Sequence, residues 1–142
     1  MESAILGLVL DSSVLVAAER KNLRTLGVIA SIRAEIADVA VAICSPTVAE
    51  LGHGNYRADT AERARQRRQF LDELKSHVPI HPVIEVTADI IAQVGGELAA
   101  KAIRLSLADL IIGASALELG YAIATANVRD FSRIPGLDVR RV

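Results

Sequence analysis

The sequence has few residues that could stabilise it covalently or mark it for export. Among its 142 residues there is one cysteine, so no disulfide can form within the chain. Cys44 follows Val41, Ala42 and Ile43, a pattern typical of a buried strand, and we interpret it as inert packing. Cysteine usage of this kind is compatible with a reducing compartment.

Long apolar runs are also missing. No segment approaches the ~20 apolar residues that a membrane helix requires, and Asp11 would interrupt the apolar core of a signal peptide. The sequence therefore predicts a cytoplasmic protein with no membrane partner.

Neither sign of charge dominates, since 16 basic and 17 acidic residues give a formal net charge of −1. Any binding of nucleic acid must then depend on a local basic patch. Four arginines of the region 58–77 could form such a patch and contact an RNA backbone. They are Arg63, Arg65, Arg67 and Arg68. A solvated helix face, paired with Asp59, Glu62 and Asp72, explains them equally well.

Aromatic residues make up only 3% of the chain, yet hydrophobic residues make up 51% and the mean hydropathy is +0.35. The surplus is alanine, valine, isoleucine and leucine. It could lie at an interface, such as a homodimer contact or a docking groove, or it could cover both faces of a sheet. The length predicts a single domain over residues 1–142.

Strand-like and helix-like segments alternate along the chain. Strands are predicted at 5–10, 39–44, 78–83, 121–125 and 137–142. Helices are predicted at 13–21, 23–36, from 45 on, 58–77, 87–103 and 106–120, with a turn or short helix at 127–134. Two prolines place the strand at 78–83 on an edge. This order predicts an α/β fold with a mostly parallel sheet of four to five strands between helix layers.

Local signals refine several helix ends. Asp11 or Ser12 could cap the first helix, Thr87 could cap the helix that runs to about 103, and Ser106 could cap the last long helix. Pro46 suits a first helical turn. The glycines at 52, 54 and 95–96 predict softened or interrupted helices.

Four acids stand close to predicted strand ends or helix starts. They are Asp11, Glu50, Asp109 and Asp130. Each has a purely structural alternative. Asp11 could be only an N-cap, and Asp130 could belong to a turn. The patterns 47–50 and 106–109 resemble capping boxes that would occupy Glu50 and Asp109.

Taken together, the four acids predict a shared site. The carboxyl ends of parallel strands and the starts of the following helices lie on one edge of a sheet. Carboxylates gathered there repel one another and raise each other's pKa, which a hard divalent cation such as Mg²⁺ or Mn²⁺ would offset. Such a site suits metal-assisted hydrolysis of a phosphodiester. His53 follows Glu50 by three residues, but the single Glu-x-x-His pattern among strands does not predict a di-iron site.

Four segments, in this order, resemble PIN-domain ribonucleases, and most closely VapC-type toxins of toxin–antitoxin pairs. They are residues 9–15, 47–51, 107–112 and 125–131. The resemblance covers nearly the whole chain. It implies a PIN-like three-layer α/β/α sandwich, an RNA substrate and a cognate antitoxin. From the hydrophobic surplus we also expect a homodimer.

The same resemblance implies roles for individual residues. Asp11 and Asp109 would be the principal Mg²⁺ ligands, with Mn²⁺ as an alternative ion, and Glu50 and Asp130 would help to hold the metal or its water. Three polar residues would support these acids by hydrogen bonding. They are Ser13, Thr125 and Asn127. A PIN-like module that binds RNA or protein without cutting is the alternative hypothesis, although four intact acids argue against it.

Overall fold

A five-stranded parallel sheet forms the centre of the computed structural model, which describes residues 4–142. The strands are β1 (Gly7–Leu10), β2 (Ala40–Cys44), β3 (Ile80–His81), β4 (Ala122–Thr125) and β5 (Val139–Arg141). Their spatial order is β3-β2-β1-β4-β5, and every neighbouring pair is parallel. The predicted fold class is confirmed, and the short proline-flanked strand β3 lies on an edge as predicted.

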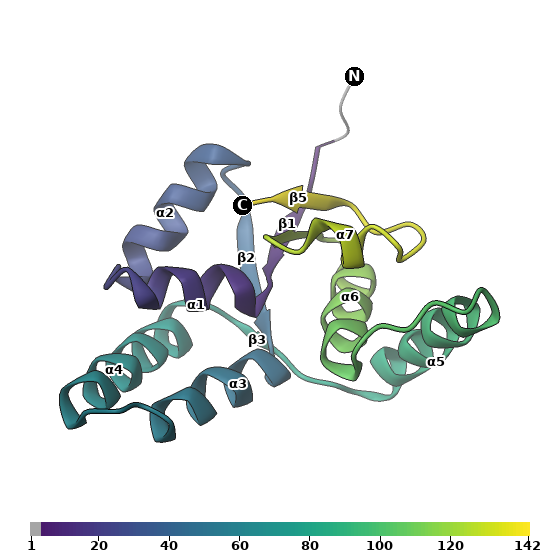
Figure 1. Ribbon diagram of the computed structural model, residues 1–142. Helices are drawn as coiled ribbons and strands as arrows, with labels where there is room; N and C mark the ends of the chain where they lie inside the picture. The colour runs from purple at the N-terminus through teal and green to yellow at the C-terminus, as the bar shows by residue number, and fades with distance from the viewer. Residues whose placement is uncertain (1–3) are drawn as a thin grey trace.

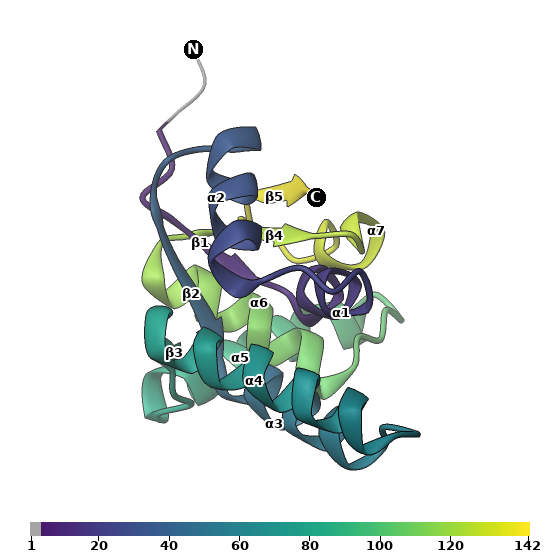
Figure 2. The same cartoon turned by 90° about the vertical axis from the view of Figure 1, so that its left-hand side faces the viewer.

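Helices cover both faces of this sheet (Figure 1). They are α1 (Ser12–Arg20), α2 (Thr25–Glu35), α3 (Ser45–Tyr56), α4 (Ala61–His77), α5 (Glu85–Ala100), α6 (Leu107–Leu119) and α7 (Val128–Phe131). The helices α1 to α4 lie on one side of the strands and α5 to α7 on the other (Figure 1). A view turned by 90° looks onto the side covered by α1 to α4 (Figure 2).

Successive side chains of the central strands pack alternately into two separate hydrophobic cores, one on each face of the sheet. Leu8 and Leu10 of β1 pack with the cluster under α1, α2 and α4, whereas Val9 packs with the cluster under α5 and α6. Strand β4 repeats this alternation, with Ile123 in the second cluster. Because both faces are covered, the three inner strands β2, β1 and β4 are almost entirely apolar, and much of the hydrophobic surplus lies in these cores. Cys44 is fully buried, and burial raises the pKa of its thiol to about 11, as expected for inert packing.

Several helix ends match the local signals. Pro46 lies in the first turn of α3, and Ser106 caps α6 by accepting a hydrogen bond from the Asp109 amide at 3.1 Å. Gly120 ends α6 with φ at +69°, a conformation that glycine adopts without a Cβ penalty.

Other local predictions were wrong. Helix α3 continues through Gly52 and Gly54, and α5 continues through residues 95–96, because packing against neighbouring helices outweighs the weak preference of glycine. Helix α5 begins at Glu85, so Thr87 lies inside its first turn, where its hydroxyl accepts a hydrogen bond from the Ile84 amide at 3.2 Å. Within residues 4–142, no helix combines the length and apolarity needed to cross a membrane.

Candidate active site

Asp11 stands at the carboxyl end of the central strand β1, immediately before α1, and is only 4% exposed. Its Oδ2 accepts hydrogen bonds from the Ser13 hydroxyl at 2.7 Å and the Thr125 hydroxyl at 2.8 Å. Thr125 ends the neighbouring strand β4, so this bond joins positions 114 residues apart. Although Asp11 occupies the N-cap position of α1, its side chain makes no capping bond. Its carboxylate is therefore held across the sheet edge rather than used by the helix.

A chain of hydrogen bonds connects Asp11 with Asp130. The Thr125 hydroxyl, which donates to Asp11, accepts from the Asn127 amide at 2.9 Å. The Asn127 side chain then donates to Asp130 Oδ2 at 3.0 Å. The Ser13 hydroxyl also accepts from the Ala126 amide at 3.3 Å. The structure thus places all three of the predicted supporting residues in contact with an acid.

Asp109 lies in the first turn of α6 and is electrostatically coupled to the other three acids. Burial is the main cause that raises the pKa of its carboxyl group, and repulsion from Asp11 adds to it. Asp130 and Glu50 raise the pKa further, while contact with the Ser106 hydroxyl counteracts part of the rise. The three other acids therefore lie near enough to Asp109 to raise its pKa by repulsion, in addition to the larger effect of burial.

Glu50 faces Asp109 across a cavity of about 450 Å³ between α3 and α6. The capping-box alternative for Glu50 is wrong, because α3 begins at Ser45 rather than after Thr47. Thr47 is instead fully buried inside the helix, and its hydroxyl has no hydrogen-bond partner. The glutamate side chain is therefore free of a capping role and lines the cavity.

Sequence reasoning missed the other α3 residues that line this cavity. Pro46, Ala49 and His53 lie beside Glu50 in its wall. Ala49, Glu50 and His53 follow Pro46 by three, four and seven residues. This spacing is the signal that could have predicted one shared helix face. Ser12, Ser106, Ala108 and Ile112 contribute the remaining wall from α1 and α6 and the loop before it.

The donor set fits a hard divalent cation in its chemistry, because carboxylate oxygens are the ligands that Mg²⁺ and Mn²⁺ prefer. Over residues 4–142, no three His, Cys, Asp or Glu side chains are already arranged so that they could hold an ion. A cation would therefore have to draw the acids closer together. The raised pKa of Asp109 shows that the carboxylates would gain from such neutralisation.

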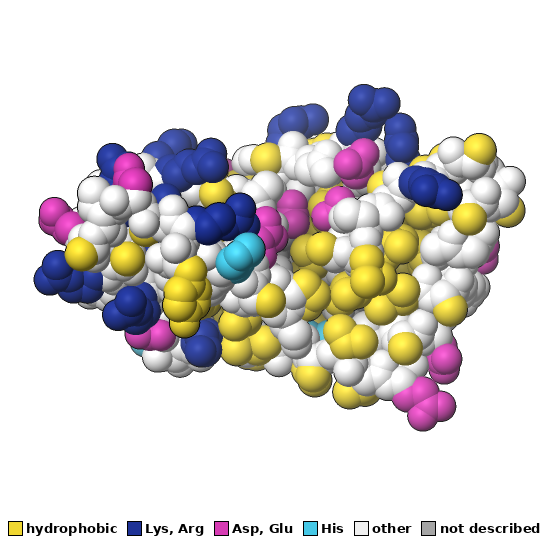
Figure 3. All heavy atoms as spheres, turned by 60° about the horizontal axis from the view of Figure 1, so that its bottom comes forward, with side chains coloured by type: hydrophobic (Ala, Val, Ile, Leu, Met, Phe, Trp, Pro, Cys, Tyr) yellow, Lys and Arg dark blue, Asp and Glu magenta, His cyan; other side chains and the backbone are white. Residues whose placement is uncertain are grey.

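Acidic side chains gather near the middle of the molecular face shown in Figure 3. Basic side chains flank them on the side of α3 and α4, and an apolar region extends toward α5 and α6. The four arginines of α4 differ in their partners. Arg63 pairs with Asp59 at 2.9 Å, and Arg67 pairs with Glu19 at 3.3 Å. Arg65 and Arg68 make no ion pair in the described part of the chain and line a shallow hollow on the same helix.

The arginine hypothesis leads to a salt-dependence prediction. If Arg65 and Arg68 contact RNA phosphates, replacing both by Gln should weaken binding and reduce the salt slope by about 0.7 for each phosphate that is no longer neutralised. Titration of labelled RNA at several salt concentrations measures that slope. Lys101→Gln, an exposed charge at the end of α5, is the matched control. An unchanged slope in the double variant would assign these arginines to a solvated face.

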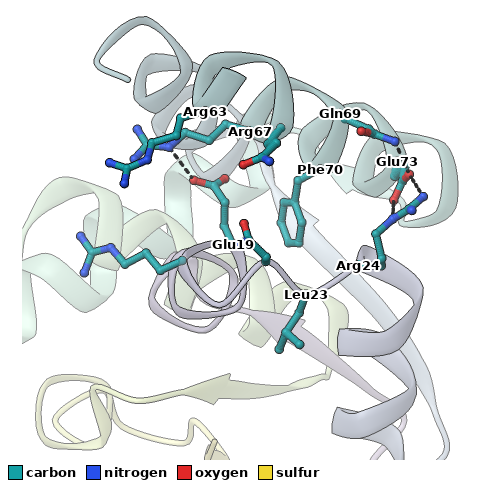
Figure 4. A pocket seen from close by; sticks show the side chains of 11 residues that line it. Glu19, Leu23, Arg24, Arg63, Arg67, Gln69, Phe70 and Glu73 are labelled. Atoms are coloured by element: carbon teal, nitrogen blue, oxygen red, sulfur yellow. Dashed lines mark hydrogen bonds and ion pairs between the residues drawn. The ribbon is translucent and has the colours of Figure 1, made fainter. Parts of the chain in front are cut away.

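A larger cavity, of about 650 Å³, is lined by none of the four site acids and lies between α1, the loop before α2 and α4 (Figure 4). Phe70 and Leu23 form apolar parts of its wall, and the Glu19–Arg67 and Arg24–Glu73 pairs flank it. Burial raises the pKa of Glu19, although Arg67 and Arg20 lower it in part. This hollow offers a mixed apolar and charged surface.

The protein is an α/β protein with acids at the carboxyl edge of a parallel sheet, which is the edge where open α/β sheets generally bind their ligands. The model of the PIN domain matches residues 8–137, and the chain belongs to the PIN-domain family. Two similar proteins are ribonuclease VapC1 of Rickettsia felis and ribonuclease VapC of Rickettsia bellii. Each is 30% identical to the chain over 138 residues, which cover 96% of this chain and 97% of the relative.

Solved structures share the same fold. The DNA-bound VapBC of Salmonella typhimurium matches with a TM-score of 0.80 and 20% identity. The VapBC2 of Rickettsia felis, bound to a promoter DNA fragment, matches with a TM-score of 0.79 and 23% identity. Each alignment covers 96% of this chain and 98% of the solved chain. The resemblance seen in the sequence is therefore confirmed for the family and the fold.

Proposed function

We propose that this chain is a divalent-metal-dependent endoribonuclease that hydrolyses RNA phosphodiester bonds as the toxin of a toxin–antitoxin pair. The names of its relatives, ribonuclease VapC, support the reaction, and the VapBC complexes support the pairing. The observation that carries the proposal is the electrostatic coupling of four acids from separate segments around Asp109, beside an open cavity.

Each acid has a distinct part in this proposal. Asp11 and Asp109 would be the principal ligands of Mg²⁺ or Mn²⁺, and Glu50 and Asp130 would complete the site. A bound ion would neutralise charge on the phosphate and would lower the pKa of a water molecule that it binds. Ser13 and Thr125 fix the orientation of the Asp11 carboxylate through two hydrogen bonds. Asn127 holds Asp130 in the same way, so two of the four acids, Asp11 and Asp130, are oriented before any substrate arrives.

Incubation of the purified protein with a labelled pool of structured RNAs tests this function directly. We expect cutting with Mg²⁺ or Mn²⁺ and none with EDTA. Glu50→Gln, purified in parallel, should cut at least about tenfold more slowly, which excludes a contaminating nuclease. Absence of cutting by the folded, antitoxin-free protein across several RNA classes would favour the non-catalytic binding module instead.

The partners follow from the same proposal. An antitoxin segment would fit the hollow between α1, the loop before α2 and α4, whose apolar wall and paired charges suit an amphipathic peptide. A second copy of the chain is a further partner, supported by exposed apolar side chains at Val83, Ile84, Val86 and Leu107. A cytoplasmic location would give this enzyme access to its RNA.

A further inference from the structure

Tyr56 is an exposed aromatic residue in a protein that has almost none. Of the four aromatic side chains, Phe70 and Phe131 are buried and Tyr121 is half-buried, with its ring against Gly7. Tyr56, the last residue of α3, is 90% exposed. Its ring thus contributes little to the core, and both of its faces are available to a ligand.

The position of Tyr56 continues the helix face that lines the acid cavity. Pro46, Ala49, Glu50 and His53 form that face, and residues 56 and 57 extend the same three- and four-residue spacing by one more turn. From Glu50 to Tyr56 the helix rises about 9 Å. A ligand that occupies the acid cavity and extends along α3 therefore reaches the Tyr56 ring next.

Basic and polar groups accompany this ring. The Arg57 guanidinium donates a hydrogen bond to His53 Nδ1 at 3.1 Å, which connects the end of α3 with the cavity wall. Arg67 of α4 donates to the Gly54 carbonyl at 2.8 Å, so a second guanidinium lies against the same end of the helix. Figure 3 shows the basic region that adjoins the acidic centre on this side.

We propose that Tyr56, with Arg57 and His53, forms a subsite for an unpaired nucleotide adjoining the scissile phosphate of the RNA. The base stacks on the Tyr56 ring, and Arg57 contacts the backbone phosphate. This inference rests on the proposed ribonuclease function and adds to it the residues of this chain that hold the nucleotide next to the cut. Single-stranded RNA is typically recognised by aromatic stacking together with basic contacts to the backbone.

The structure favours nucleic acid over a protein segment at this position. His53 lines the same cavity as Glu50 and Asp109, so the subsite adjoins the acids. The hollow between α1, the loop before α2 and α4 is lined by neither His53, Tyr56 nor Arg57. Arg57 and Arg67 both form hydrogen bonds at this end of α3, and Arg57 makes no ion pair in the described part of the chain, so its charge is available to a phosphodiester backbone.

Binding of a short unstructured RNA oligonucleotide, measured by fluorescence anisotropy with Mg²⁺, tests the proposal. An Asp109→Asn background prevents cutting during the measurement. Tyr56→Ala should weaken the Kd about tenfold, while Tyr56→Phe, which keeps the ring, should stay within about twofold. Leu26→Ala, which trims an exposed apolar side chain of α2, is the matched control and should also stay within about twofold. In the cutting-competent protein, Tyr56→Ala should raise KM and leave kcat nearly unchanged.

Oligonucleotides with a single abasic position identify the stacked base. At one position, the missing base should weaken RNA binding about tenfold in the protein that retains Tyr56. The same oligonucleotide should bind the Tyr56→Ala variant as tightly as the intact RNA does. Unchanged RNA affinity in Tyr56→Ala, with cutting intact, would overturn the proposed subsite but would not contradict the proposed ribonuclease function. Loss of antitoxin inhibition with unchanged RNA affinity would likewise overturn it, in favour of a protein contact. Failure of the wild type to cut or bind any RNA would overturn the proposed function itself.

Discussion

Asp109→Asn is expected to lower RNA cleavage by more than about 100-fold while leaving the metal-free protein as stable as the wild type or more stable. The loss of cleavage is expected because we propose Asp109 as a principal metal ligand. Removing a ligand should lower activity more than removing a residue that only hydrogen-bonds to a ligand. The retained stability follows from the raised pKa of Asp109, caused first by burial and then by repulsion from Asp11. Asparagine keeps the size of the side chain and removes its charge.

The stability effect of this substitution should depend on pH in a defined direction. Because the pKa of Asp109 is higher in the folded protein than its ordinary value of 3.8, the wild type is destabilised as pH rises through the folded pKa. The variant is not destabilised in this way. Its advantage should therefore be present at neutral pH, shrink as pH falls through the raised pKa, and vanish below 3.8.

Thermal unfolding in EDTA at several pH values measures this difference. A gain of up to about 3 °C at neutral pH is expected, because loss of a favourable charge at the start of α6 offsets part of the relief. Asp89→Asn on the exposed face of α5 is the control for removing a carboxylate. Added Mg²⁺ should raise the melting temperature of the wild type more than that of the variant. Clear destabilisation of Asp109→Asn in EDTA would instead assign the carboxylate a capping role.

Asp11→Asn is expected to abolish cleavage to a similar extent but, unlike Asp109→Asn, to destabilise the fold. The Asp11 carboxylate is buried and accepts hydrogen bonds from the hydroxyls of Ser13 and Thr125. An amide in its place weakens these charge-assisted bonds and can leave a buried donor unpaired, at a cost of about 1–3 kcal/mol.

Denaturant unfolding of the two variants in EDTA measures this contrast under matched conditions. A lower midpoint with an unchanged slope would show that the Asp11→Asn variant loses stability without a change in the unfolded state. Equal stability of both variants would contradict the hydrogen-bond argument. In that case the link between β1 and β4 would not depend on the charge of Asp11.

Much of the fold could be predicted from local patterns. The unbroken apolar run before Asp11 predicted a strand covered on both faces, and the structure divides Leu8 and Val9 between two cores. The prolines around β3 predicted an edge strand, which is where it lies. These predictions succeed because burial on two faces and the missing N–H of proline constrain the chain locally.

Predictions failed where neighbours in space outweighed local preference. The pattern 47–50 has the residue types of a capping box, but Pro46 and the end of β2 start the helix at Ser45 and bury Thr47. The glycines of α3 and α5 do not interrupt their helices, because packing against α4 and α6 holds these helices in place.

The sequence by itself determined the order of the elements, the parallel sheet between helix layers and the residues that could form an acidic site. Only the tertiary structure decided how those acids are used. It brings Thr125 to Asp11 across 114 residues, and it turns Glu50 into the cavity shared with Asp109. The reason is physical: periodicity and capping depend on neighbours within one or two turns, whereas hydrogen bonds and repulsion between carboxylates depend on distances that exist only after the strands have paired.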